Sequence, residues 1–363
     1  MSLLETLFSP YKLGNISLQN RIVMAPMTRS RAIGNIPNAL MADYYGSRAS
    51  AGLIITEGVA PSPNGLGYAR IPGIYSDEQI AGWKKVTDAV HAKGGRIFVQ
   101  IMHTGRIAHQ LNLPAGAEVI GASPIAAANT QMYTDQEGMQ PHPVPREVPT
   151  SDIPSIITEF VHAAKSAIVA GFDGVELHGA NGYLLEQFLN TASNRRTDQY
   201  GGSIENRNRL VLKVTAAVAD AIGKERTGIR LSPFGYSNEI LPDETTEEQY
   251  TKLAAGLKAI GIVYIHLVDH SALGAPAVPQ SVKDAIKKEF GGTIILSGGY
   301  EPDRAEADLK AGKGELIAFG RPFIANPDLV ERLSKGEELA LADQNTFYTP
   351  GEKGYTDYPV LTN

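Results

Sequence analysis

The sequence predicts an α/β fold in which helices cover a parallel sheet, and three observations support this. Short runs of aliphatic and β-branched residues alternate with longer helical patterns along the chain. Several helical patterns stop at a glycine, as at Gly171, Gly223 and Gly261, which is a common way for a helix to end. Eight such units within 363 residues suit a closed barrel better than an open, doubly wound sheet.

The predicted elements follow one another regularly. The strands cover residues 21–24, 52–56, 96–101, 174–177, 228–231, 262–266, 293–297 and 316–319. The helices between them cover residues 77–93, 154–170, 206–222, 246–260, 281–290 and 301–311, with Asp77 as the expected cap of the first. No glycine-rich dinucleotide fingerprint opens the first unit, which argues against a Rossmann domain.

One connection, residues 104–151, differs from the others. It is rich in Pro, Gly, Ala and Asn and shows no helical pattern. A loop of this length inside a compact domain is either functional or disordered. Because it follows the third strand, we expect a lid-like insertion over the mouth of the barrel, with a hairpin. No other break in composition occurs, so residues 1–363 are expected to form a single domain.

The composition limits the possible functions. A formal charge of −6 gives no reason to expect a nucleic acid or a membrane surface as a partner. The absence of cysteine excludes disulfides, thiolate nucleophiles, and zinc or iron–sulfur centres held by cysteine, and no other metal-binding cluster is expected. Neither a secretion signal nor an apolar stretch of about 18 residues is present, so a soluble, cytoplasmic protein is expected.

Arg230 is the most informative residue at the predicted carboxyl ends of the strands, where β/α barrels build their active sites. It lies between Ile229 and Leu231 in an apolar strand. A buried guanidinium needs an anion or several acceptors, because an isolated buried charge is very costly. It is therefore either part of a structural salt bridge to a barrel carboxylate or a cation held against an anionic cofactor.

Two more clusters stand at strand ends. Gly298 and Gly299 follow the seventh strand, and Gly320 and Arg321 follow the eighth. Exposed backbone N–H groups and an arginine at these strands are typical of a phosphate site, although glycine there is also ordinary turn chemistry.

The second cluster, His178, Asn181 and Tyr183, follows the fourth strand. Each could be a rim or packing residue. Together they could hold an oxygen-bearing substrate while another group delivers a proton.

At these positions the chain resembles a known family. The most specific segments are HGANGYLLEQFLNTASNRRTDQYGGSIENRNRL, VQIMHTGR and IAFGRPFIANPDL. They resemble the Old Yellow Enzyme family, in particular its classical bacterial ene-reductases, which include pentaerythritol tetranitrate reductase and N-ethylmaleimide reductase. The resemblance spans nearly the whole chain and implies a (β/α)8 TIM barrel that binds FMN non-covalently.

The resemblance also implies roles for individual residues. Thr28 and Gln100 would hydrogen-bond to the flavin ring, Gly58 would lie against it, and Arg230 would face its pyrimidine edge. His178 and Asn181 would hold a carbonyl or nitro oxygen of the substrate, and Tyr183 would donate a proton. The other implied contacts are Ala25, Pro26 and Met27 for the cofactor, Gly298, Gly299, Gly320 and Arg321 for its phosphate, and Tyr68, Met102 and Tyr348 for the substrate cavity.

Two positions are specific to this chain or its branch. Met102 stands where many similar enzymes carry tryptophan, which implies a wider pocket. Thr28 stands where another branch of the family carries cysteine.

The resemblance implies an enzyme in which NADH or NADPH reduces FMN and the flavin then reduces activated C=C bonds of α,β-unsaturated carbonyls, imides and nitroalkenes. Its partners would be small electron-poor molecules, and the protein would be a monomer or a homodimer. Reduction of nitrate esters or nitroaromatics is an alternative main activity. Two other classes stay open: a flavin-free barrel lyase or isomerase acting on a phosphorylated metabolite, and a non-enzymatic ligand-binding barrel.

Overall fold

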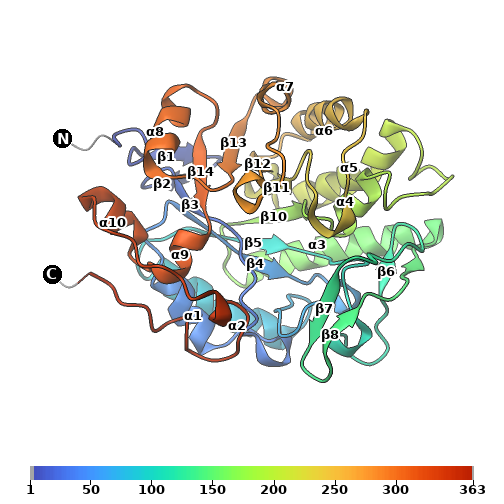
Figure 1. Cartoon of the computed structure of the whole chain (residues 1–363), viewed down its shortest axis with the longest axis horizontal. Helices are drawn as coiled ribbons and strands as arrows, with labels where there is room; N and C mark the ends of the chain where they lie inside the picture. The colour runs from blue at the N-terminus through green and yellow to red at the C-terminus, as the bar shows by residue number, and fades with distance from the viewer. Residues whose placement is uncertain (1–3, 362–363) are drawn as a thin grey trace.

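The computed structural model describes residues 4–361, and at its centre lies a closed barrel of eight parallel strands (Figure 1). Around the barrel the strands follow one another in chain order, and the last pairs with the first. They are β3 (Ile22–Met24), β4 (Leu53–Val59), β5 (Ile97–Ile101), β10 (Gly174–Gly179), β11 (Thr227–Leu231), β12 (Tyr264–Val268), β13 (Thr293–Ser297) and β14 (Leu316–Phe319). The predicted (β/α)8 barrel is confirmed.

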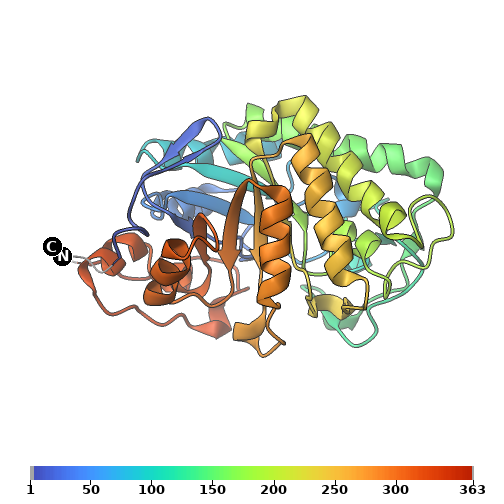
Figure 2. The same ribbon diagram turned by 90° about the horizontal axis from the view of Figure 1, so that it is seen from above.

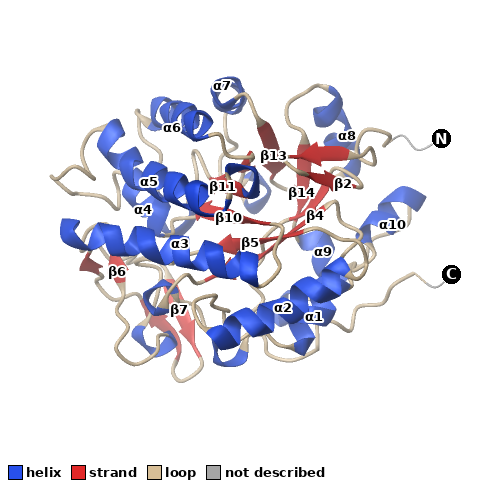
Figure 3. Ribbon diagram, turned by 180° about the vertical axis from the view of Figure 1, so that it is seen from behind, coloured by secondary structure: helices blue, strands red, loops and turns tan. Residues whose placement is uncertain are grey.

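Helices surround the sheet on its outer face, as the views from above and behind show (Figures 2 and 3). The six predicted helices are α2 (Asp77–His91), α3 (Ile153–Val169), α5 (Ile204–Ile222), α6 (Thr246–Ile260), α7 (Gln280–Phe290) and α8 (Pro302–Lys310). Four others were not predicted: α1 (Ala39–Gly46), α4 (Leu184–Leu189), α9 (Arg321–Ala325) and α10 (Leu329–Lys335). All six residues of α4 are buried, so it carries no amphipathic pattern that a sequence could reveal.

The start of α2 corrects the predicted cap. Ser76 is the capping residue: its side chain accepts from the backbone N–H of Gln79, while the side chain of Gln79 accepts from the N–H of Ser76. This reciprocal capping box satisfies two N–H groups that the helix leaves free. Asp77 cannot do this, because it is already the first residue of the helix.

A short hairpin closes the amino-terminal end of the barrel. Its strands, β1 (Tyr11–Leu13) and β2 (Ile16–Leu18), pair antiparallel. They pack Leu13 and Leu18 against the lower barrel interior, which contains Val23, Leu53, Ile55, Phe98, Tyr264, Ile295, Leu316 and Ala318. Full burial of one such side chain contributes roughly 1.5–3 kcal/mol. These side chains fill the barrel interior at this end, whereas two cavities open at the carboxyl ends of the strands.

The insertion at 104–151 contains no α-helix but does contain strands. β6 (Ile120–Gly121) and β9 (Arg146–Glu147) form a short parallel pair. β7 (Gln131–Thr134) and β8 (Gly138–Pro141) form an antiparallel hairpin that stands out from the barrel (Figure 1). Across the described residues, no helix has both the length and the apolar character that crossing a membrane requires.

Candidate active site

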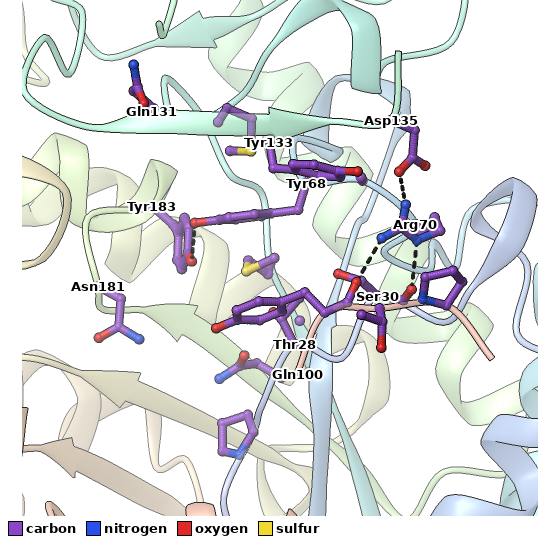
Figure 4. A pocket seen from close by; sticks show the side chains of 18 of the residues that line it. Thr28, Ser30, Tyr68, Arg70, Gln100, Gln131, Tyr133, Asp135, Asn181 and Tyr183 are labelled. Carbon is purple, nitrogen blue, oxygen red and sulfur yellow. Dashed lines mark hydrogen bonds and ion pairs between the residues drawn. The ribbon is translucent and has the colours of Figure 1, made fainter. Parts of the chain in front are cut away.

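Two adjoining cavities open at the carboxyl ends of the barrel strands, one of about 810 Å³ and one of about 950 Å³. Of the predicted site residues, the first cavity is lined by Pro26, Thr28, Gly58, Tyr68, Gln100, Met102, His178, Asn181, Tyr183, Arg230 and Tyr348 (Figure 4). The second is lined by Ala25, Pro26, Met27, Asn181, Arg230, Gly298, Gly299, Gly320, Arg321 and Tyr348. The structure thus brings all of these residues together, and Arg230 and Asn181 stand where the cavities meet.

A β-bulge shapes the floor of the first cavity. The register between β4 and β5 shifts between Ile55 and Gly58, so that Gly58 pairs with Gln100. Thr56 lies within the bulge, and its hydroxyl accepts from the backbone N–H of Gln100 at 3.1 Å. A Cβ at Gly58 would lie only 2.5 Å from the thioether of the buried Met102, so the Met102 side chain would have to move to make room for any other residue. Bulges of this kind re-aim residues at active sites.

Arg230 is held in the barrel without an ionic partner. It is only 8% exposed, and its Nε is buried without a hydrogen bond. Among the described residues no carboxylate lies within ion-pair distance of it, so the alternative of a direct structural salt bridge is wrong, although Glu176 acts on it at longer range. Burial lowers the pKa of Arg230 while nearby Glu176 raises it, and a guanidinium stays charged at neutral pH. A cation of this kind needs acceptors from a ligand.

The turn after β10 places the next polar groups. Asn181 and Gly182 both have left-handed backbones, with φ of 59° and 78°, which turns the chain sharply into α4. The carboxylate of Glu186 accepts from the Gly182 N–H at 2.7 Å and from the Ser232 hydroxyl at 2.7 Å. Ser232 in turn accepts from the Asn181 N–H at 2.9 Å. The Asn181 side chain makes no hydrogen bond to the described residues, and its Oδ1 is buried.

His178 has a defined tautomer. Its Nδ1 accepts from the backbone N–H of Ala180 at 3.3 Å, which leaves the proton on Nε2. Burial holds the pKa of His178 well below its usual value, and the charge of Arg230 lowers it further. The imidazole therefore lines the first cavity as a neutral N–H donor.

Tyr183 lies beside His178, with ring centroids 4.8 Å apart and nearly perpendicular rings. Its hydroxyl lies 2.9 Å from that of Tyr68. Burial raises the pKa of Tyr183 well above its usual value, and Tyr68 adds to this effect. The phenol is therefore protonated at neutral pH and can act as a proton donor.

The second cavity has the features of an anion site. Gly298 and Gly299 have φ of 135° and 61°, conformations that other residues rarely adopt. Arg321 is exposed and makes no ion pair or hydrogen bond to the described residues. A free arginine beside glycine backbone is suited to a phosphate group.

The hairpin borders the mouth of the first cavity, and sequence reasoning did not identify its contacts. Gln131, Met132, Tyr133, Asp135 and Met139 all line the cavity. Arg70 connects this region to the rest of the site, because it pairs with Asp135 and donates to the carbonyls of Ser30 and Tyr348 (Figure 4). An arginine next to aromatic residues in a loop was a weak signal that many surface loops share.

Sequence reasoning also missed a buried polar network in the barrel, made by Glu176, Tyr264 and His266. The available signal was the same as for Arg230, a charged residue within an apolar strand. Over the range 4–361, no group of three or more His, Asp or Glu residues could hold a metal ion.

The residues present fit a hydrogen-bonding ligand with an anionic tail. Arg230 and Asn181 line both cavities, and each has a buried polar atom without a partner among the described residues, while Arg321 offers a free charge in the second cavity. Together with the barrel, these features are those of a β/α-barrel enzyme that binds a phosphate-bearing cofactor.

Comparisons with known proteins identify the family. The sequence model of the NADH:flavin oxidoreductase / NADH oxidase family matches residues 6–340. The chain is 41% identical to 12-oxophytodienoate reductase 7 of Oryza sativa over 98% of this chain and 94% of the relative. It is 40% identical to a Leishmania infantum protein named a probable flavin mononucleotide-dependent alkene reductase, over 99% and 98% of the two chains.

Solved structures agree. Morphinone reductase superposes with a TM-score of 0.95 at 46% identity, covering 98% of this chain and 96% of that one. An Old Yellow Enzyme homologue from Zymomonas mobilis superposes with a TM-score of 0.93 at 39% identity, covering 98% of this chain and 100% of that one. The chain belongs to the NADH:flavin oxidoreductase / NADH oxidase family, which is the Old Yellow Enzyme family. It is an FMN-dependent, NAD(P)H-dependent oxidoreductase, which removes the flavin-free and non-enzymatic alternatives.

Proposed function

We propose that this enzyme reduces activated C=C bonds of α,β-unsaturated carbonyls, imides and nitroalkenes with electrons from NADH or NADPH. One observation carries the proposal: a neutral histidine, a free asparagine side chain and a protonated tyrosine converge on one cavity beside Arg230. Relatives are named alkene and 12-oxophytodienoate reductases, and morphinone reductase is known in complex with tetrahydroNAD.

The cofactor site would use residues of both cavities. Thr28, Gly58, Gln100 and Arg230 would hold the ring, and Arg321 would bind the phosphate with the backbone of the loops at Gly298-Gly299 and Gly320. Ala25, Pro26 and Met27 would line the rest of the site. When bound, FMN accepts hydride from the nicotinamide and supplies it to the substrate.

His178 and Asn181 would hold the oxygen of the activating group. Both can donate N–H hydrogen bonds, and because His178 is buried and Asn181 is half-buried, these bonds are stronger than in water. Negative charge develops on this oxygen as hydride reaches the β-carbon, so the two donors stabilise the transition state more than the ground state.

Tyr183 would then protonate the α-carbon, since its side chain lines the same cavity and its phenol carries its proton at neutral pH. Tyr68, Met102 and Tyr348 would shape the space around the substrate, and the hairpin would border its entrance as the predicted lid-like element.

Reduction of nitrate esters or nitroaromatics is a second candidate, because the same two donors can hold a nitro group. A substrate panel separates the two. Full-length enzyme would be assayed with NADH and with NADPH against 2-cyclohexenone, N-ethylmaleimide, a nitroalkene and a nitrate ester. Higher kcat/KM for the alkenes supports the proposal. Turnover of the nitrate ester alone would contradict it.

A further inference from the structure

Glu176 is a carboxylate sealed inside the barrel, and none of the steps above uses it. It lies in β10, pairs in register with Gln100 on one side and Gly228 on the other, and is fully buried. Any side chain at Gly228 would overlap the ring of Tyr264 on the next strand. Glycine at this position therefore lets Tyr264 reach across β11 to Glu176.

Three donors converge on this carboxylate. Gln100 Nε2 lies 2.8 Å from Oε1, while the Tyr264 hydroxyl and His266 Nδ1 lie 3.0 Å and 2.9 Å from Oε2. Burial alone would raise the pKa of Glu176, but His266, Arg230 and the hydrogen bonds together lower it. Burial lowers the pKa of His266 while Glu176 raises it, and the ring nitrogen Nδ1 carries the proton that is donated to Glu176. Glu176 is thus an ionised group that only accepts hydrogen bonds.

An acceptor in this position determines which way the Gln100 amide faces. The amide has one donor end and one acceptor end, and only the donor end can face a carboxylate. The backbone of Gln100 is fixed independently by Thr56. Because Nε2 of Gln100 donates to Glu176, its carbonyl Oε1 is the amide atom available to the first cavity, which Gln100 lines.

We propose that Glu176 is a positioning residue that locks the Gln100 amide with its carbonyl toward the cofactor and offsets the charge of Arg230. Through Gln100, Glu176 selects a ring that carries an N–H donor on the adjacent edge. Its negative charge also lowers the positive electrostatic potential that Arg230 creates at that edge. The inference rests on the proposed cofactor contacts of Gln100 and Arg230.

The test is Glu176→Gln, which changes one oxygen to an NH2 group and keeps the shape. Tyr264 and His266 both donate to one side, so the new amide oxygen belongs there and its NH2 faces Gln100. The Gln100 amide must then turn over and present its NH2 group to the cavity. There it would face the N–H donor on the edge of the ring, and no hydrogen bond could form. FMN should bind about 10- to 100-fold more weakly. Removal of the negative charge should shift the FMN midpoint potential to a more positive value.

A swap variant, Glu176→Gln with Gln100→Glu, separates positioning from packing. Here the NH2 of the new residue 176 donates to one carboxylate oxygen at position 100, and the other oxygen again presents an acceptor to the cavity. FMN affinity should recover to within a few-fold of wild type, and the potential should return toward or below the wild-type value. If Glu176→Gln alone fails to fold, the FMN affinity and midpoint potential of the swap variant still test whether Glu176 positions the Gln100 amide.

The measurements are release of fluorescent FMN on dilution of the holoprotein, and the midpoint potential by dye equilibration. Glu159→Gln is the matched control, since Glu159 also has a buried carboxylate oxygen but lines neither cavity. Equal FMN affinity in wild type and a folded Glu176→Gln, or no recovery in the swap, would overturn the inference. Failure of wild type itself to retain FMN would instead overturn the cofactor site.

Discussion

The hydroxyl groups of Tyr68 and Tyr183 lie 2.9 Å apart, so one phenol donates a hydrogen bond to the other. For Tyr183 to give its proton to a substrate, it must accept from Tyr68. The two rings are nearly perpendicular, with centroids 6.1 Å apart, and both side chains line the first cavity. Tyr68 therefore orients the proposed proton donor.

Replacing Tyr183 by Phe removes this donor and keeps the ring against His178. Reoxidation of the reduced enzyme by an enone should slow by about 10²–10⁴-fold, the usual contribution of general acid catalysis. Flavin reduction by the nicotinamide should stay nearly normal. Reduction of a nitroalkene should be affected less than that of an enone, because the anion formed after hydride transfer can leave the site before its carbon is protonated. Tyr68→Phe should show a smaller loss in the same step. Stopped-flow kinetics of the two half-reactions provides the measurement. Equal slowing of both halves would show that Tyr183 has a structural role.

Replacing His178 by Ala should weaken oxygen-anchored ligands such as phenols by about tenfold, because one hydrogen-bond donor in a buried site is lost. Enone reduction should slow as well, and nicotinamide binding is expected to weaken if the same donor holds its carboxamide. Since burial keeps the wild-type imidazole neutral, ligand affinity should not change between pH 6 and 8 through this group. Titration of a phenol by its absorbance change on binding tests both points, and a rise in affinity as the pH falls through 6.5 would contradict the neutral donor.

Arg321 and Arg230 should affect different properties of the cofactor. Arg321 is exposed and makes no hydrogen bond within residues 4–361, so Arg321→Ala should weaken FMN retention with little change in thermal stability. Arg230 is buried and lies beside the proposed site of the flavin ring, so Arg230→Met in a holo variant should make the flavin harder to reduce. FMN release and the midpoint potential measure the two effects. An unchanged FMN affinity would remove Arg321 from the site, and an unchanged potential would do the same for Arg230.

Glu186 should make stability depend on pH. Burial raises its pKa from 4.5 to about 7, so the folded protein binds this proton more tightly than the unfolded chain does. The stabilisation is complete below pH 4.5 and is lost as the pH rises toward about 7. Glu186→Gln stays neutral and should flatten part of this slope in Tm against pH. Burial also raises the pKa of Glu57 to about 7, so Glu57 should preserve the remaining part of the slope of Tm against pH. A slope identical to wild type would show that Glu186 does not titrate in this range.

The sequence by itself determined the barrel and most of its site. β13 and β14 begin and end where the pattern predicted, because a strand buried on both faces has a run of apolar residues at its centre. Arg230 was identifiable for the same reason, since a charge stands out in such a strand. The residues implied by the resemblance line the two cavities, and their chemical roles stay predictions.

Only the tertiary structure decided which buried groups meet. Nothing in the local sequence shows that Tyr264 crosses Gly228 to reach Glu176, or that Glu176 faces the amide of Gln100. Arg70 and Asp135 are likewise 65 positions apart and meet only because the insertion returns to the barrel mouth. Local patterns report whether a residue is buried, whereas barrel closure and strand register determine its partner. That partner sets the protonation state and orientation of each polar group in the site.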